Sequence, residues 1–329
     1  MLSLRDAIRP TTFIESSKLR DHLGLDITIA SETFQHTGSF KFRAAYNLAL
    51  NVPNDNLLTA SSGNFGQALA YSCKLLGKRC TVVMPATSAQ VKIDAVRGFG
   101  ATVDLIDTKT VGRSERVAQL RDRMPDAYVA SPYDDQLVID GNATLGQELA
   151  AKNFDAIIVP VGGGGLISGT ISALSGFLSE PGSIATDLPS EPGAIATGFF
   201  SRPEIYGAEP LLANDAARSF KSGQLIANES EPMTIADGAR TLSLGTLNWP
   251  IIQTGVTDII EVSEHNIAEA LRLYFTLANL KTEPTAALSL GAVLENKENF
   301  RDKNLCLIVS GGNVDPDVYL SVLKGSLQS

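Results

Sequence analysis

Short apolar runs alternate with longer helical patterns along nearly the whole chain, and this alternation limits the fold more than any other feature of the sequence. Four runs are strand candidates, at residues 80–84, 103–106, 156–161 and 305–309. Such nearly continuous apolar strands are typical of parallel sheets that helices cover on both faces. The sequence therefore predicts a fold of the α/β class.

Helical patterns at residues 66–76, 114–123 and 266–277 separate the strand candidates, and Ser263 precedes the last of them as a capping residue. Polar turns at residues 53–56 and 131–135 enclose a segment with strands and helices of its own. We therefore expect a large domain formed by residues 1–52 and 133–329, and a smaller domain, residues 53–132, inserted into it.

Composition excludes several classes of protein. Hydrophobic residues make up 44% of the 329 residues, which excludes a disordered chain. The net charge of −9 repels phosphate backbones, so we expect no nucleic-acid partner. The first ten residues carry charges where a signal peptide needs an apolar stretch, and the three cysteines show no metal or redox spacing. The uncharged run 156–179 contains Pro160 and six glycines, so it predicts a strand, a turn and a helix, not a membrane span. We expect a cytoplasmic protein.

One short repeat interrupts the pattern. The sequence SEPGSIAT at residues 179–186 recurs as SEPGAIAT at residues 190–197. Two copies are too few for a solenoid. We expect a duplicated surface loop, with a substrate-gating lid as the alternative.

Lys41 is the first candidate for chemistry. It stands in the segment T-G-S-F-K-F-R, between two phenylalanines and two residues after a Gly-Ser turn. Partial burial there would lower the pKa of the ammonium group, as a Schiff-base lysine requires. The alternative is an ordinary solvated lysine at the start of a helix.

Two segments present backbone amides ahead of predicted helices. Ser61, Ser62, Gly63 and Asn64 precede the helix at 66–76, where free N–H groups suit a carboxylate or phosphate, or simply cap the helix. The run Gly162, Gly163, Gly164, Gly165 follows a buried strand and can form a nest of amides for a phosphate. It matches neither a dinucleotide-binding nor a Walker-A motif, and a flexible turn is the alternative.

Ser310 begins the segment S-G-G-N directly after the strand candidate at 305–309. Open α/β sheets bind ligands at the carboxyl ends of their strands, so the Ser310 hydroxyl is placed to meet one. A simple turn explains the segment equally well.

The order of these four segments resembles the fold-type II pyridoxal-phosphate enzymes, and within them the serine/threonine dehydratase and serine racemase branch. Further matches lie at residues 131–134 (SPYD), 141–148 (GNATLGQE), 235–238 (IADG), 248–250 (NWP) and 283–285 (EPT). The resemblance implies two domains with open, mostly parallel sheets flanked by helices and pyridoxal 5′-phosphate (PLP) as cofactor, and we also expect a homodimer.

The resemblance also assigns roles to residues. Lys41 would form the internal aldimine with PLP and move the Cα proton. Ser310 would face the pyridine nitrogen, and Asn64 would bond the 3′-oxygen of the ring. Phe40 would lie beside the cofactor, and Gly162, Gly163, Gly164, Gly165 and Leu166 would hold its phosphate. Ser61, Ser62 and Gly63 would bind the substrate, with Ser62 as a second catalytic group.

The implied reaction is β-elimination of water from a small hydroxy amino acid of the serine or threonine type, which gives a 2-oxo acid and ammonia. Racemisation through Ser62, dehydration of 3-hydroxyaspartate, and a non-catalytic binding protein are the alternatives. Phe65 stands where the dehydratases usually carry a histidine, which leaves the substrate open.

A divalent cation is also implied. Glu209, Ala213 and Asp215 match the spacing at which serine racemases and related dehydratases bind Mg²⁺ or Ca²⁺. Two carboxylates and a backbone carbonyl are the hard oxygen ligands that these ions prefer. The alternative is a solvated acidic turn.

Overall fold

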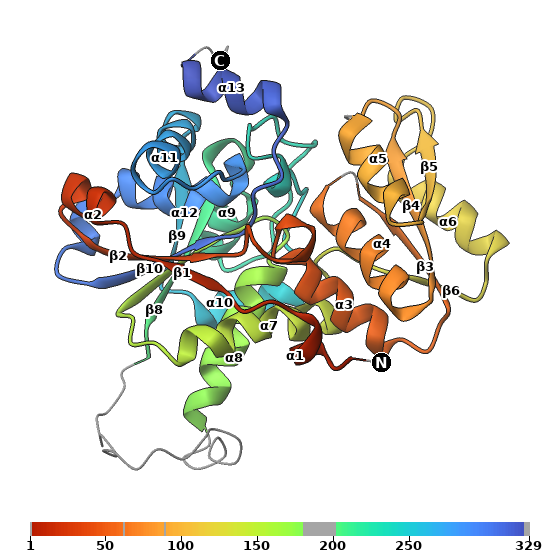
Figure 1. Ribbon diagram of the computed structural model, residues 1–329, viewed down its shortest axis with the longest axis horizontal. Helices are drawn as coiled ribbons and strands as arrows, with labels where there is room; N and C mark the ends of the chain where they lie inside the picture. The colour runs from red at the N-terminus through yellow and green to blue at the C-terminus, as the bar shows by residue number, and fades with distance from the viewer. Residues whose placement is uncertain (1, 62, 89, 180–201, 326–329) are drawn as a thin grey trace.

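A six-stranded sheet forms the larger part of the molecule (Figure 1). The computed structural model describes residues 2–61, 63–88, 90–179 and 202–325. The first two strands of this sheet pair antiparallel, and every other neighbouring pair is parallel. In spatial order the strands are β1 (Thr12–Ile14), β2 (Asp26–Ser31), β10 (Asn304–Val309), β7 (Ala156–Pro160), β8 (Glu204–Pro210) and β9 (Asp258–Val262).

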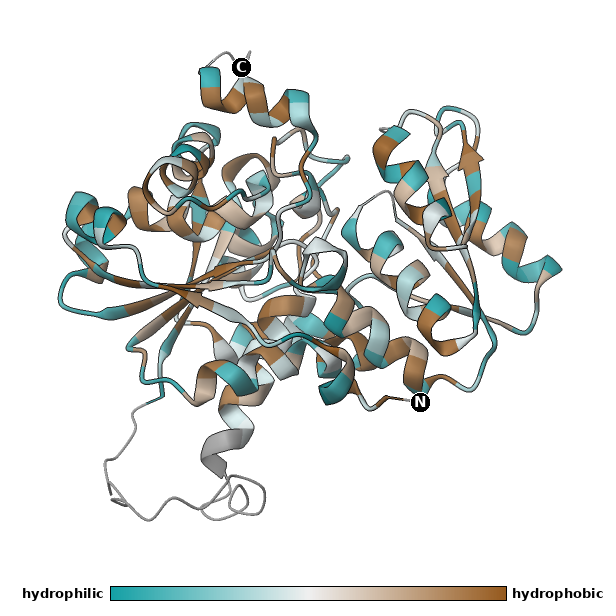
Figure 2. Cartoon of the chain, in the orientation of Figure 1, coloured by the Kyte–Doolittle hydropathy of each residue, from teal (hydrophilic) through white to brown (hydrophobic). Residues whose placement is uncertain are grey.

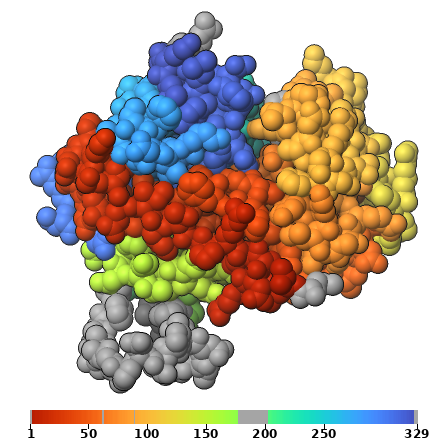
Figure 3. Space-filling view, in the orientation of Figure 1, coloured from red at the N-terminus to blue at the C-terminus, as the bar shows by residue number. Residues whose placement is uncertain are grey.

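A second sheet of four parallel strands lies beside it. Figure 3 shows its part of the chain, in orange to yellow, as a lobe next to the rest of the molecule. In spatial order its strands are β5 (Thr102–Ile106), β4 (Arg79–Pro85), β3 (Asn56–Ala60) and β6 (Ala127–Val129). All four fall inside the segment expected to form the small domain, although the domain boundaries themselves stay a prediction.

Helices cover both sheets, with α3 and α7 packed together where the two sheets meet. The helices are α1 (Leu4–Ala7), α2 (Ser17–Leu23), α3 (Lys41–Asn51), α4 (Asn64–Leu76), α5 (Gln90–Gly98), α6 (Arg113–Arg123), α7 (Gln136–Ala150), α8 (Gly165–Ser179), α9 (Asp215–Ser222), α10 (Asn248–Gly255), α11 (Glu264–Leu277), α12 (Pro284–Glu295) and α13 (Pro316–Lys324). Short 3₁₀ turns are η1 (His36–Gly38), η2 (Leu211–Ala213), η3 (Asp237–Ala239) and η4 (Lys297–Phe300).

The large sheet is buried on both faces, which explains its apolar strands. Along β7, Ile158 packs into the cluster formed with α11 and α12, whereas Ile157 and Val159 pack into the cluster formed with α7 and α8. Successive side chains of a strand point to opposite faces, so two helical layers require apolar residues at every position. Figure 2 shows this concentration of hydrophobic residues on the strands and the inner helix faces.

The structure confirms the α/β class and the four predicted strands, which are β4, β5, β7 and β10. The predicted helices are α4, α6 and α11, and Ser263 caps the last by accepting a hydrogen bond from the Asn266 N–H at 3.3 Å. The duplicated sequence lies outside the described residues from position 180 onward. In the described part of the chain, no helix combines the length and the apolar character that crossing a membrane requires.

Candidate active site

A cavity of about 980 Å³ lies where strands of both sheets end. Ala60, Pro85 and Val129, at the carboxyl ends of β3, β4 and β6, line it from the small sheet. Pro160 and Ser310, at the ends of β7 and β10, line it from the large sheet. Parallel α/β sheets place their ligands at this edge, so the topology itself locates the site.

Lys41 is the first residue of α3 and lines this cavity. Its Nζ donates a hydrogen bond to the carbonyl oxygen of Pro132 at 2.7 Å and lies 5.0 Å from the centroid of the Phe40 ring. The second aromatic ring beside it is Phe65, at 5.8 Å; Phe42, the other neighbour in the sequence, packs against His36 instead. Burial lowers the pKa of Lys41 to about 8, with the Glu283 carboxylate opposing that shift.

Contacts with the segment after β10 fix the turn before Lys41. The Phe40 N–H donates to the Ser310 carbonyl at 2.9 Å, and the Asn313 side chain donates to the Thr37 carbonyl at 2.6 Å. Ser310 is itself buried and lines the cavity. The S-G-G-N segment is therefore a structural partner of the lysine turn as well as a wall of the cavity.

The four glycines form the turn between β7 and α8, and all of them line the cavity. The ring of Tyr133 lies directly against Gly163, where an added Cβ would come within 2.2 Å of the ring. Among the described residues, the backbone N–H groups of Gly163, Gly164, Gly165 and Leu166 make no hydrogen bond. Free amides at the start of a helix are the donor set that a phosphate group fits.

Asn64 begins α4, lines the cavity, and binds residues just before α12 and just after β10. Its Nδ2 donates to both carboxylate oxygens of Glu283 at 2.9 Å, and its Oδ1 accepts from Asn313 Nδ2 at 2.8 Å. Glu283 is only 4% exposed. Burial raises the pKa of Glu283 to about 7, and the Asp237 carboxylate adds to this shift.

At the start of α4, Ser61 accepts hydrogen bonds from backbone N–H groups, as the helix-capping alternative predicts. The Ser61 hydroxyl accepts from the Gly66 N–H at 3.1 Å and from the Gly63 N–H at 3.4 Å. Ser61 and Gly63 also line the cavity, whereas Ser62 lies outside the described residues. The substrate role of the three residues stays a prediction.

Comparison with known proteins agrees with this geometry. The family model described as "Pyridoxal-phosphate dependent enzyme" matches residues 4–311. The chain belongs to this family. It is 34% identical to L-threo-3-hydroxyaspartate ammonia-lyase of Saccharomyces cerevisiae, over 98% of this chain and 93% of that protein. It is also 34% identical to serine racemase of Schizosaccharomyces pombe, over 95% and 92%.

A solved structure extends the likeness to the fold. The threonine deaminase of T.th. superimposes with a TM-score of 0.81 at 36% identity, covering 93% of this chain and 92% of that one. PLP is therefore the cofactor of this enzyme. The residues present fit it, because a half-buried lysine of lowered pKa and a row of free amides face the same cavity.

The predicted cation ligands also come together. Glu209 is the last residue but one of β8 and Asp215 begins α9, with Ala213 between them in η2, and all three are buried. The Glu209 carboxylate accepts from the Ala216 and Ala217 N–H groups at 2.9 Å each. Asp215 Oδ2 is buried with no hydrogen-bond partner among the described residues. The solvated acidic turn is therefore wrong, because both carboxylates are enclosed.

Three residues of the site received no role from the sequence. Glu283 and Tyr133 belong to the segments EPT and SPYD, and Asn313 ends S-G-G-N. Each lies in a segment that matches the family, but nothing in the local sequence indicates that Glu283 meets Asn64 or that Tyr133 covers Gly163. Proline directly after Glu283, at the start of α12, is the one local signal, because it marks a helix N-terminus.

Proposed function

We propose that this enzyme is an ammonia-lyase that eliminates water from a small β-hydroxy amino acid and yields a 2-oxo acid and ammonia. The observation that carries the proposal is the position of Lys41. Lys41 is half-buried, its amine has a pKa of about 8, and it lines the same cavity as the free amides of the glycine turn. A lysine of this kind is largely protonated at neutral pH and can still lose its proton readily.

Each residue of the cavity has a proposed task. When bound, PLP withdraws electrons from the Cα of an attached amino acid. Lys41 takes and returns the proton at that atom, and Phe40 limits the space beside it. The amides of Gly162, Gly163, Gly164, Gly165 and Leu166 hold the phosphate, the Ser310 hydroxyl faces the ring nitrogen without adding a charge, and the Asn64 amide faces the ring oxygen.

Charge in the cavity favours a substrate with one carboxylate. Two cations reach the cavity from the side of the small sheet, and each already has an acidic partner. Lys92 Nζ lies 2.8 Å from Asp237, and Arg113 lies 2.5 Å from Glu231. A serine- or threonine-type substrate leaves both ion pairs intact.

Dehydration of 3-hydroxyaspartate is the second candidate, and Arg113 is the observation that favours it. The yeast relative is named for L-threo-3-hydroxyaspartate. The side-chain carboxylate of that substrate would need to replace Glu231 on the guanidinium group, which can bind a carboxylate through two hydrogen bonds. Glu231→Gln should then lower KM for 3-hydroxyaspartate and leave KM for L-serine unchanged.

The deciding experiment is a panel of L-serine, L-threonine and L-threo-3-hydroxyaspartate, scored for 2-oxo acid, ammonia and the inverted amino acid. We expect 2-oxo acid and ammonia in equal amounts. Inverted amino acid forming faster than 2-oxo acid would instead establish a racemase, and Ser62→Ala would then abolish inversion. Borohydride reduction should place the cofactor on Lys41; an adduct elsewhere, with a fully active Lys41→Ala, would contradict the proposal.

A divalent cation held by Glu209, Asp215 and the Ala213 carbonyl is part of the proposal. Burial and the neighbouring Asp215 carboxylate raise the pKa of Glu209 well above its usual range, and burial raises the pKa of Asp215 to about 7. Mg²⁺ or Ca²⁺ would offset this repulsion. EDTA should lower the melting temperature and Mg²⁺ should restore it, whereas Asp215→Asn should respond to neither.

The expected homodimer and the cytoplasmic location remain proposals. Light scattering of the purified protein would test the first: a mass near 70 kDa, twice that of the 34.9 kDa chain, supports a dimer, and a mass near that of one chain contradicts it. Fractionation of the source cells would test the second.

A further inference from the structure

The turn formed by residues 131–134, S-P-Y-D, contacts both halves of the cofactor site. It directly follows β6, and the Ser131 hydroxyl closes it by accepting from the Asp134 N–H at 2.9 Å. The Pro132 carbonyl accepts from Lys41, and the Tyr133 ring lies against Gly163. One short turn therefore sets the distance between the lysine and the glycine turn.

Asp134 ties this turn to α10. Its Oδ2 accepts from the Thr246 N–H and hydroxyl at 3.0 Å each, and its Oδ1 accepts from the Leu247 N–H at 2.9 Å. Leu247, the N-cap residue of α10, provides no side-chain cap of its own. A carboxylate at the start of a helix satisfies free N–H groups and is favoured by the helix dipole. Asp134 thus caps a helix that begins more than a hundred residues later.

Asn248, the first residue of α10, links the capped helix to the glycine turn. Asn248 Nδ2 donates to the Gly163 carbonyl at 2.9 Å and to the Tyr133 carbonyl at 3.0 Å, and the Gly245 N–H donates to Gly163 as well, at 3.0 Å. Fixing the Gly163 carbonyl fixes the peptide plane that carries the next N–H. Asn248 is fully buried and directly follows Leu247, whose N–H donates to Asp134, so the cap holds the backbone beside it.

We propose that Asp134 is a positioning residue for cofactor binding. By capping α10 it holds Asn248 on the carbonyls of Gly163 and Tyr133, and thereby keeps the free amides of the glycine turn at the spacing that a phosphate requires. The same turn keeps the Pro132 carbonyl on Lys41. Asp134 acts through these groups and touches neither substrate nor cofactor.

The test measures two quantities for each variant: the dissociation constant of PLP, by absorbance titration of the cofactor-free protein, and the melting temperature. Asp134→Asn places an amide N–H₂ where only an acceptor fits, and should weaken PLP binding about tenfold. Ser263→Ala is the matched control: it removes a helix cap on α11, and is expected to lower the melting temperature without changing PLP affinity. Equal PLP affinity in Asp134→Asn and wild type would overturn the proposal.

Gly245→Ala provides a second variant should Asp134→Asn fold poorly. A Cβ at Gly245 would lie 2.6 Å from Asp134 Oδ1 and 2.6 Å from Asn248 Nδ2, so it displaces both groups while leaving them chemically intact. It should weaken PLP binding as Asp134→Asn does. In a double-mutant cycle, Asp134→Asn and Asn248→Ala should be less than additive in PLP affinity; additive losses would show that Asp134 does not act through Asn248.

Discussion

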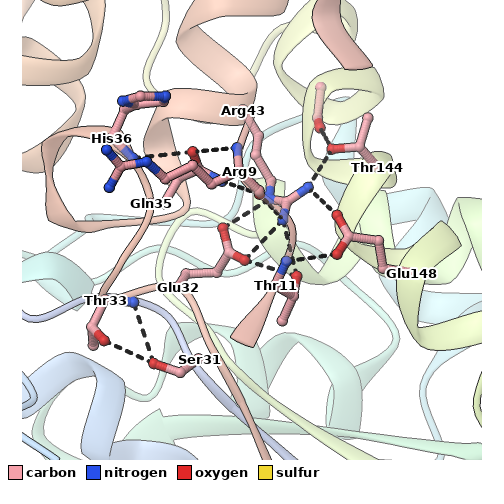
Figure 4. Close-up of polar contacts among 11 residues, drawn as sticks. Arg9, Thr11, Ser31, Glu32, Thr33, Gln35, His36, Arg43, Thr144 and Glu148 are labelled. Atoms are coloured by element: carbon pink, nitrogen blue, oxygen red, sulfur yellow. Dashed lines mark hydrogen bonds and ion pairs between the residues drawn. The ribbon is translucent and has the colours of Figure 1, made fainter. Parts of the chain in front are cut away.

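Replacing Arg43 by methionine should destabilise the protein more than any loss of a surface ion pair. The Arg43 side chain, two residues after Lys41, is fully buried and binds Glu32 through two hydrogen bonds of 2.7 and 2.9 Å (Figure 4). It also binds Glu148 at 2.7 Å, Thr11 at 2.9 Å and Thr144 at 3.1 Å. The guanidinium group thus joins α7, the chain before β1 and the residue directly after β2 to α3.

The expected loss in the free energy of unfolding follows from the groups that Arg43→Met leaves unpaired. Arg43→Met leaves the Glu32 carboxylate fully buried with the Thr11 hydroxyl as its remaining hydrogen-bond donor in the described part of the chain. Removing one partner of a buried pair costs about 3–5 kcal/mol. Glu148 contributes less to this cost, because its side chain is 27% exposed and keeps a hydrogen bond from the Thr11 N–H. We therefore expect a loss of about 3–5 kcal/mol in the free energy of unfolding.

Urea unfolding of the cofactor-free protein, followed by circular dichroism, measures this loss. Arg116→Met is the matched control, because Arg116 binds Asp104 through two hydrogen bonds but both side chains are partly exposed, and such pairs contribute about 1 kcal/mol or less. The double variant Arg43→Met with Glu32→Leu should recover part of the stability by removing the unpaired charge. Equal losses in Arg43→Met and Arg116→Met, or a double variant less stable than Arg43→Met, would refute this reasoning.

Three further predictions concern the cavity. Because the pKa of Lys41 is about 8, the rate of PLP capture should rise about tenfold per pH unit below pH 8 and level off above it. Stopped-flow absorbance measures this rate, and a rate that does not change with pH would contradict the prediction. Burial raises the pKa of Glu283 from 4.5 to about 7, so the native state binds more protons than the unfolded chain between these values, and stability should fall as the pH rises through this window. Urea unfolding at pH 5 and pH 7 should show a smaller fall in Glu283→Gln than in the wild type, because the buried Glu209 and Asp215 carboxylates contribute to the fall in both proteins. Gly163→Ala should weaken PLP binding at least tenfold in absorbance titrations, because the new methyl group meets the Tyr133 ring. Gly98→Ala, where the methyl group meets open space, should leave PLP binding unchanged. Equal affinities in the two variants would contradict the prediction and show that the ring can move aside.

The sequence indicated those parts of the fold in which local pattern and burial agree. β7 is apolar along its whole length because the sheet is covered on both faces, α8 carries no charged residue, and the glycines between them mark the turn. β8 was not predicted, because its sequence EIYGAEP carries Glu204 and Glu209. Glu204 is paired with Lys303, and Glu209 is held by the start of α9. Tertiary partners that stabilise an acidic residue in a strand leave no periodic pattern in the strand itself.

In the candidate site, too, the sequence points to residues whose signal is local and misses residues that act on distant segments. Lys41 and the glycine turn became candidates on local grounds, as a lysine after a small turn and as consecutive amides before a helix, and the order of the four segments, through the resemblance to the family, then assigned their roles. Glu283 and Asp134 were not assigned a role, because each acts on a segment more than a hundred residues away. An acidic residue in a polar segment resembles a solvated one until its partners are known.

Lys41 and Glu283 illustrate why these long-range contacts matter to the chemistry. Burial lowers the pKa of Lys41 to about 8 and raises that of Glu283 to about 7, because it disfavours the charged form of both groups. Each group opposes the shift of the other, because the Glu283 carboxylate raises the pKa of Lys41 and the Lys41 charge lowers that of Glu283. Asn64 also favours the charged carboxylate, because its two hydrogen bonds to Glu283 lower the pKa of that group. Burial therefore sets the direction of the Lys41 shift, and Glu283, which forms one hydrogen-bonded row with Asn64 and Asn313, opposes it.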